Sequence, residues 1–292
     1  MKIKNFVLVV ILSGILLKAE QTSAGSTQET VCFKIYENLI KEFALEDEKT
    51  AAEKEIKKWS NYKKQCESTC EYEMYLAELY CSKGDRKQCR TLSEDVVNKK
   101  GKVCDVRVAE RTLMGLDGEE GNFDSMRRRS EAMIRKYPDW YIGYYFYALA
   151  LFHDGRILEA KKYFEKTNEI EENAYAFGWL ALIYYIQYQN YQKTVELYEK
   201  AYDLKRNVLM LPSSTFAAID SAMQLGRWGA AEALLDLQQE ADENIVNDPT
   251  YKKLKSKMDA YRKGYCLKQK ALSVQQGAHQ TSTNGTVHHE KN

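Results

Sequence analysis

Apolar and polar residues alternate along the middle of the chain with the spacing of amphipathic helices. The clearest stretch runs from Gly155 to Phe164 (GRILEAKKYF), a tight turn followed by a helix with one apolar face. Before that turn lies a second apolar run that includes Tyr144 and Leu151. Apolar residues that recur three or four positions apart are typical of helices rather than strands. The pattern therefore predicts two helices joined by a short turn.

This turn-and-helix phrase recurs along the chain. Similar phrases begin at Gln189 and Gly226, and weaker versions begin at Gly84 and Gly121. Successive phrases lie 34 or 37 residues apart. A period of this size is the signature of a solenoid built from helical hairpins.

The best repeat also shows an ordered series of large and small residues. Large residues alternate with small ones in the order Tyr144, Tyr147, Ala148, Leu151, Gly155, Ala160 and Phe164. The two alanines allow neighbouring helices to approach closely, and Gly155 supplies the positive φ that ends the first helix. This order resembles the tetratricopeptide-repeat family.

The resemblance covers residues 70–248. It is closest at 141–174 and 174–208, and looser at 107–140 and 212–245. It implies an all-α fold, a solenoid of antiparallel helical hairpins that forms a tetratricopeptide-like superhelix.

The two ends of the repeat array have the character of caps. Residues 25–69 predict an N-terminal helical cap, and residues 249–271 predict a Lys-rich C-terminal capping helix, because a solenoid needs polar terminal helices. The C-terminal helix has a basic face that we interpret as solvated, with contact to an acidic partner as the alternative. This face consists of Lys252, Lys253, Lys255, Lys257, Arg262 and Lys263. Residues 272–292 are rich in Ser, Gln, Thr, Gly and His, which predicts a disordered tail.

The first residues predict a secretory signal peptide over residues 1–24. Lys2 and Lys4 precede an apolar run, Phe6 to Leu17, that is too short to span a bilayer. Small residues follow, which allow cleavage after Ala24, and Leu17-Lys18-Ala19 is a second option for the cleavage site. We expect a secreted or periplasmic protein with no stable membrane span after cleavage. An uncleaved anchor is the alternative.

Composition narrows the kind of partner. The 292 residues include 43 basic and 42 acidic side chains, for a formal net charge of +1. Such a balance gives no overall attraction to nucleic acid, so we expect none to bind. Only three prolines occur, which suits a mostly helical chain.

Seven cysteines follow the predicted signal, an arrangement that favours disulfides in an exported protein. The repeat register places Cys81 and Cys89 on facing helices of one hairpin, so we expect these two to pair. The pairing of the other clustered candidates, Cys66, Cys70 and Cys104, stays open. An odd count leaves one thiol free or paired between chains. A Cys-based metal or redox site is a further alternative, but no histidine lies nearby, and we expect no metal.

No motif predicts an enzyme or a cofactor. The chain has no Gly-rich phosphate loop and no Gly-x-Ser-x-Gly elbow. His153 is the only histidine in the repeats, and we expect it at the end of a helix.

The resemblance implies which residues line the concave inner face of the solenoid. Carried onto this sequence, these positions are Ile142, Tyr145, Leu149, Phe152, Tyr175, Gly178, Leu182, Tyr185, Phe216, Asp220 and Met223. Such an apolar, aromatic groove suits an apolar peptide or helix of a partner protein. The alternative for each residue is packing between repeats. A self-associating structural subunit is the second function that the sequence allows.

Overall fold

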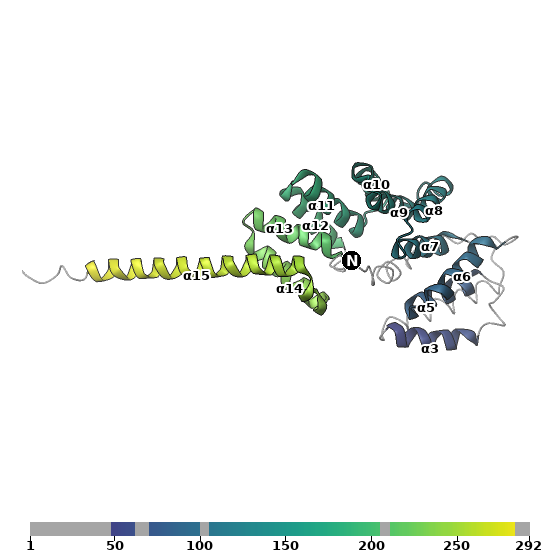
Figure 1. Ribbon diagram of the computed structural model, residues 1–292, viewed down its shortest axis with the longest axis horizontal. Helices are drawn as coiled ribbons and strands as arrows, with labels where there is room; N and C mark the ends of the chain where they lie inside the picture. Colours follow the sequence, from purple (N-terminus) through teal and green to yellow (C-terminus); the bar gives the residue numbers. More distant parts are fainter. Residues whose placement is uncertain (1–47, 62–69, 100–104, 205–210, 284–292) are drawn as a thin grey trace, which may run out of the picture. The chain divides into compact units, whose positions relative to one another are not determined.

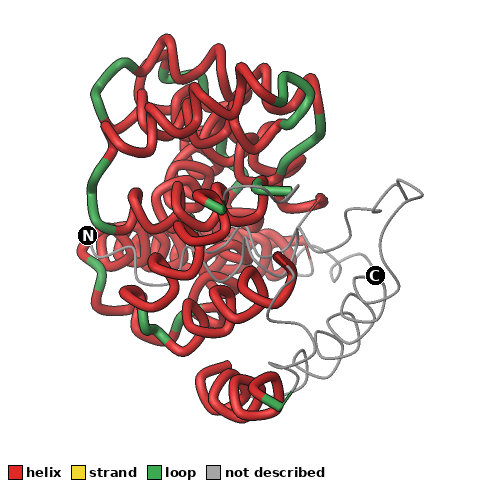
Figure 2. Tube along the Cα trace, turned by 90° about the vertical axis from the view of Figure 1, so that its right-hand side faces the viewer, coloured by secondary structure: helices red, strands yellow, loops and turns green. Residues whose placement is uncertain are grey.

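The computed structural model describes residues 48–61, 70–99, 105–204 and 211–283. Every regular element in these ranges is helical, and no strand occurs among them (Figures 1 and 2). Successive helices pack against each other, which confirms the predicted all-α solenoid of helical hairpins. Contacts within the chain divide it into two compact units, Met1–Ala176 and Phe177–Asn292.

The first unit consists of consecutive antiparallel hairpins. Each helix packs on the next along the chain up to α10, except that α3 packs directly on α5 (Figure 1). The helices are α3 (Glu48–Ser60), α5 (Cys70–Lys83), α6 (Arg86–Asn98), α7 (Arg107–Glu119), α8 (Phe123–Lys136), α9 (Tyr141–His153) and α10 (Ile157–Ile170).

The second unit continues the same plan. Helix α12 packs on α13, α13 packs on α14, and α15 contacts both α13 and α14. The elements are α11 (Ala174–Tyr188), which belongs to this unit from Phe177 on, α12 (Tyr191–Leu204), α13 (Pro212–Gln224), α14 (Trp228–Ala241), the 3-10 helix η2 (Glu243–Asn247) and α15 (Pro249–Thr283).

The predicted turns lie between the two helices of each hairpin. The residue with positive φ is a glycine at four of the turns, and at the fifth it is Gln189 with φ 47°. At Gly155, with φ 77°, the Arg156 N–H donates to the carbonyl of Leu151 at 2.9 Å and closes the end of α9. This bond satisfies a carbonyl that the helix end would otherwise leave without a donor.

Small residues allow the helices of a hairpin to approach closely, as the sequence predicts. Ala148 of α9 and Ala160 of α10 have no exposed surface. The rings of Tyr145 and Phe164 fill the adjacent space, with centroids 5.9 Å apart. Tight packing of this kind makes each hairpin a stiff support for the side chains on its surface.

The last helix is longer than the sequence indicates. Helix α15 runs to Thr283 and does not end at residue 271, so the predicted disordered tail of 272–292 is wrong for residues 272–283 (Figure 1). No proline interrupts this stretch, and its one glycine costs a helix only about 1 kcal/mol. Residues 284–292 lie outside the described ranges, as do the predicted signal peptide and residues 25–47 and 62–69 of the predicted N-terminal cap.

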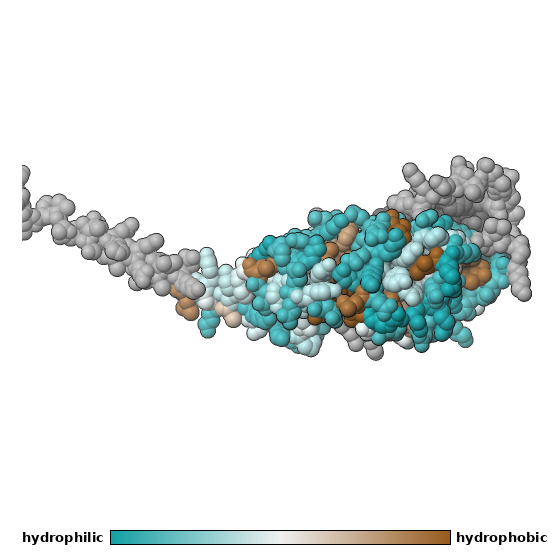
Figure 3. Space-filling model, turned by 90° about the horizontal axis from the view of Figure 1, so that it is seen from above, coloured by the Kyte–Doolittle hydropathy of each residue, from teal (hydrophilic) through white to brown (hydrophobic). Residues whose placement is uncertain are grey.

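The described surface is mainly hydrophilic on the face shown in Figure 3, where hydrophobic residues form small separate patches. Among the described residues, no helix combines the length and the apolar character that a bilayer span requires.

Candidate partner-binding site

In the first unit, most of the predicted groove residues are part of the packing between helices. Ile142, Tyr145, Leu149 and Tyr175 are only 4–6% exposed, whereas Phe152 is partly buried. The Tyr145 ring contacts both neighbouring helix α10 and Phe146 on its own helix. These side chains offer a partner little surface, and their role in binding stays a prediction.

In the second unit, the predicted groove residues differ in exposure. Leu182 and Tyr185 of α11 are partly exposed. Phe216 and Met223 of α13 are buried and belong to a core cluster that includes Met258 of α15. The core therefore fixes α15 against α13 and holds the adjacent surface in place.

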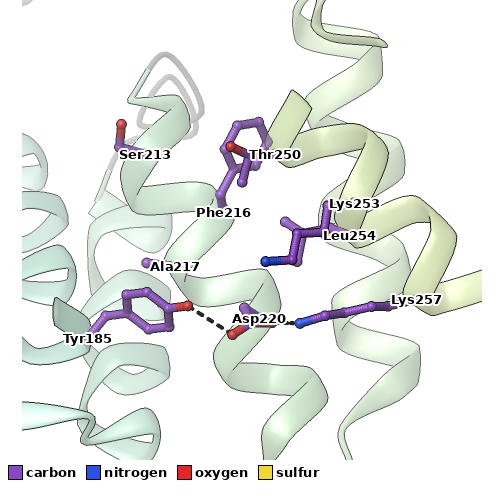
Figure 4. A pocket seen from close by; sticks show the side chains of 9 residues that line it. All are labelled: Tyr185, Ser213, Phe216, Ala217, Asp220, Thr250, Lys253, Leu254 and Lys257. Atoms are coloured by element: carbon purple, nitrogen blue, oxygen red, sulfur yellow. Dashed lines mark hydrogen bonds and ion pairs between the residues drawn. The ribbon is translucent and has the colours of Figure 1, made fainter. Parts of the chain in front are cut away.

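Three of the predicted inner-face residues, Tyr185, Phe216 and Asp220, line the same pocket. The pocket has a volume of about 250 Å³ and is formed by side chains of α11, α13 and α15 (Figure 4). We call it the α13–α15 pocket, and its lining residues are Tyr185, Ser213, Phe216, Ala217, Asp220, Thr250, Lys253, Leu254 and Lys257.

Helix register explains why α13 and α15 supply most of the lining. Both helices contribute residues at positions i, i+3, i+4 and i+7, which fall on one face of a helix. The residues from α13 begin at Ser213 and end at Asp220, and those from α15 begin at Thr250 and end at Lys257. The two faces meet across the pocket.

The start of α15 is fixed by a capping carboxylate. The Asp248 side chain accepts hydrogen bonds from the N–H groups of Thr250 at 2.7 Å and Tyr251 at 3.2 Å. Pro249 occupies the first helical position, where the missing N–H costs nothing. Thr250 therefore has a defined place at the rim of the pocket.

Asp220 is the acidic centre of the pocket. Its carboxylate accepts hydrogen bonds from the Tyr185 hydroxyl at 2.9 Å and from Lys257 Nζ at 2.6 Å (Figure 4). Burial alone would raise the pKa of Asp220, but the bonds from Lys257 and Tyr185 outweigh it, and the pKa lies below its ordinary value. Burial, with the hydrogen bond to Asp220, raises the pKa of Tyr185 to about 12. At neutral pH the cluster holds a neutral phenol and a compensated ion pair.

Lys253 is the second cation of the pocket. No carboxylate among the described residues pairs with its ammonium group. Its side chain is exposed and forms no ion pair or hydrogen bond with any residue in the described ranges. Because Asp220 is already paired with Lys257, the lining carries one net positive charge. The rest of the lining is hydroxyl or apolar.

Sequence reasoning identified part of this pocket. The repeat resemblance predicts Tyr185, Phe216 and Asp220 on the inner face, whereas the sequence predicts Lys253 and Lys257 on the solvated face of a capping helix. Ser213, Ala217, Thr250 and Leu254 were not singled out. The i, i+3, i+4, i+7 spacing places the lining residues of each helix on one face. It does not show that this face of α13 packs against this face of α15.

The cysteines outside the pocket match the predicted pairing where they are described. Cys81 of α5 and Cys89 of α6 form a disulfide, with Cα atoms 5.1 Å apart, as the repeat register predicts. Cys70 is also disulfide-bonded, whereas Cys266 on α15 is an exposed free thiol. Cys66 and Cys104 lie outside the described residues.

The alternative of a Cys-based metal or redox site concerns Cys70 and Cys66, and Cys66 lies outside the described residues. The described residues contain no group of three or more His, Cys, Asp or Glu side chains placed to hold a metal ion. Cys70, Cys81 and Cys89 are in disulfides, so they have no thiolates to offer as ligands.

His153 ends helix α9, as expected, and its ring stacks on Phe123 with centroids 4.0 Å apart. Burial lowers the pKa of His153. The stacked ring packs at the end of a hairpin, which is a structural role.

No protein-family model matches the chain, and no curated protein matches its sequence significantly. The function proposed below rests on the arrangement of the residues described above.

Proposed function

We propose that this chain is an exported binding scaffold of the tetratricopeptide-repeat type, which holds an apolar segment of a partner protein in the α13–α15 pocket. One observation carries the proposal. Tyr185 and Phe216, two inner-face positions from different hairpins, line the same open pocket. The repeat resemblance implied such a shared face.

The site has the form of an anchor pocket for a peptide. Phe216, Ala217 and Leu254, only 7%, 3% and 3% exposed, form its apolar floor, and the partly exposed ring of Tyr185 forms an aromatic wall. Pockets that bury a drug-sized ligand span about 300–1,000 Å³, so a volume of about 250 Å³ suits one or two side chains of a bound segment. Anchors of this kind contribute much of the binding energy at protein interfaces.

Export is part of the same proposal. The Cys81–Cys89 disulfide supports an oxidising compartment, because disulfides are rare where thiols are kept reduced. The predicted signal peptide agrees with this location.

Chemical crosslinking in intact cells, followed by purification and mass spectrometry, tests the proposal. We expect one protein to copurify with the wild-type chain and with Tyr188→Ala, a control on the exposed part of the same helix. Tyr185→Ala removes a pocket wall, and Thr250→Trp places a bulky ring at the rim, so both should lose that protein. If both variants retain it while remaining folded, the pocket is not the binding site.

A second candidate function is self-association through α15. Tyr265 and Leu267 are 52% and 60% exposed, and the free thiol of Cys266 lies between them in the sequence. This candidate predicts a disulfide-linked dimer on non-reducing electrophoresis that disappears in Cys266→Ser. A monomer in sedimentation experiments, with or without reductant, would contradict it.

A further inference from the structure

We propose that the α13–α15 pocket selects a segment in which a carboxylate accompanies an apolar anchor, and that Lys253 is the cation that pairs with this carboxylate. This inference rests on the proposed function and adds the chemistry of the partner. The binding determinant is an Asp or Glu side chain next to an apolar side chain of the partner protein.

Three residues of the pocket lining carry charged side chains, namely Asp220, Lys253 and Lys257. Lys257 is committed to Asp220 at 2.6 Å, and Asp220 is further held by the Tyr185 hydroxyl at 2.9 Å. The Asp220 side chain is only 13% exposed, so a ligand does not reach it easily. Lys253 remains as the one lining cation without a partner in the described part of the chain.

The lining that surrounds the Lys253 side chain is partly apolar. Lys253 extends from α15 toward α13, on the same side as Phe216 and Ala217 (Figure 4). An anion that enters with an apolar group displaces water from the pocket, and less water strengthens the attraction between the charges. The hydroxyls of Ser213 and Thr250 supply further hydrogen-bond donors at the rim.

The net charge of the pocket favours a carboxylate over a phosphate as the ligand. A phosphate group carries close to two negative charges at neutral pH, and recognition of it usually employs several cations or an Arg fork. Among the described residues, the pocket offers one ammonium group without a partner, that of Lys253, because Lys257 is paired with Asp220. A single negative charge matches the one net positive charge of the lining, whereas a phosphate would leave about one negative charge uncompensated.

A matched pair of small probes tests this charge preference directly. 3-Phenylpropanoate and 3-phenylpropanamide have the same shape and differ in charge, and NMR titration of the purified, oxidised protein measures the affinity of each. We expect the acid to bind about fivefold more tightly than the amide, the size of a partly exposed ion pair. Lys253→Gln should remove this difference.

The control variant is Lys252→Gln, because Lys252 is exposed on the same helix but does not line the pocket. It should keep the preference for the acid. Equal affinities for acid and amide, a preference that survives Lys253→Gln, or no binding of either probe would overturn the inference.

A displayed library of random peptides tests whether the source is a protein segment. We expect selected peptides to carry Asp or Glu beside Leu, Ile or Phe, and selection on Lys253→Gln to lose the acidic residue. Apolar peptides without an acid would overturn the inference but leave the proposed function standing. If no peptide is enriched although 3-phenylpropanoate binds, the ligand is a free acid, and the protein-segment inference is wrong.

Discussion

At the scale of single residues, Asp220 determines the charge of the pocket. Its carboxylate is nearly buried and is held by Lys257 and Tyr185. Because the pKa of Asp220 is below its ordinary value, folding favours the ionised form. This contribution to stability is present at neutral pH and is lost as the pH falls below the ordinary aspartate pKa of about 4.

Asp220→Asn should lower the free energy of unfolding at pH 7 by about 1–2 kcal/mol, since it removes a charged hydrogen bond to a partly exposed lysine. Urea unfolding between pH 7 and pH 3 checks this, and the gap between wild type and variant should narrow as the pH falls. Asp236→Asn, an exposed change on α14, serves as the control. A gap that is constant with pH would contradict the role assigned to Asp220.

Two substitutions at turn residues should change the stability of the protein in opposite directions. Gln189 has a φ of 47°, in a region that costs a non-glycine residue about 1–2 kcal/mol. Gln189→Gly should therefore stabilise the protein by about 0.5–1 kcal/mol after the flexibility of glycine is counted. Gly155→Ala should destabilise it by a similar amount, because Gly155 has a φ of 77°.

Gly229→Ala is the matched control for these turn variants. Gly229 is the second residue of helix α14, and a Cβ there meets no atom within 4 Å. The change should stabilise the protein through helix propensity alone, by less than the difference of about 1 kcal/mol found inside a helix. Thermal unfolding measures all three variants, and a destabilised Gln189→Gly would show that the turn does not need positive φ.

At the scale of helices, the Cys81–Cys89 disulfide joins α5 to α6. Both cysteines are buried against Leu116 of α7. The double change Cys81→Ser with Cys89→Ser should cost about 2–3 kcal/mol in urea unfolding, because the bridge closes a short loop. Cys266→Ser, at an exposed free thiol, should leave stability unchanged. Equal effects of the two changes would contradict the structural role of the disulfide.

A buried ion-pair cluster connects α6, α7 and α8. Asp117 is fully buried, and its carboxylate lies 2.9 Å from Arg90 and 3.2 Å from Arg129. Asp117→Asn should cost about 2–3 kcal/mol, because it removes the fully buried charged acceptor of both arginines, although Arg90 keeps Glu120 and Arg129 keeps Glu110 as partners. Glu120→Gln removes an exposed partner of Arg90 and should cost at most about 1 kcal/mol. Similar losses in urea unfolding for the two variants would contradict this account.

The helical hairpins could be predicted because their causes are local. Amphipathic spacing and positive-φ turns repeat with the period of the hairpin, and Cys81 and Cys89 follow from that register. The burial of Asp117 could not be predicted, because nothing local distinguishes it from the other acids of the chain. The end of α15 was placed too early, since composition alone suggested disorder where the helix continues.

The candidate site was predictable only in part. The resemblance placed Tyr185 and Phe216 on one face, but the position of Lys253 depends on how α15 packs against α13. That packing is a contact between distant segments, set by buried residues such as Leu254 and Met258. The sequence alone shows a basic helix and does not show what it faces.

At the scale of the whole molecule, we assign partner binding to the second unit, Phe177–Asn292. The described helices of the first unit have their predicted groove residues mostly buried, whereas the second unit has an open pocket. Binding should therefore depend on changes near Tyr185 and Lys253 more than on changes near Tyr145.

The most direct measurement places a photo-crosslinking amino acid at Thr250, on the pocket rim, in intact cells. The control places it at Asp236, an exposed position of α14 that does not line the pocket. We expect one partner protein to be crosslinked from Thr250, through a segment that carries an acidic and an apolar residue, and none from Asp236. No crosslinked protein from Thr250, or the same proteins from both positions, would contradict the central claim that this pocket holds a partner.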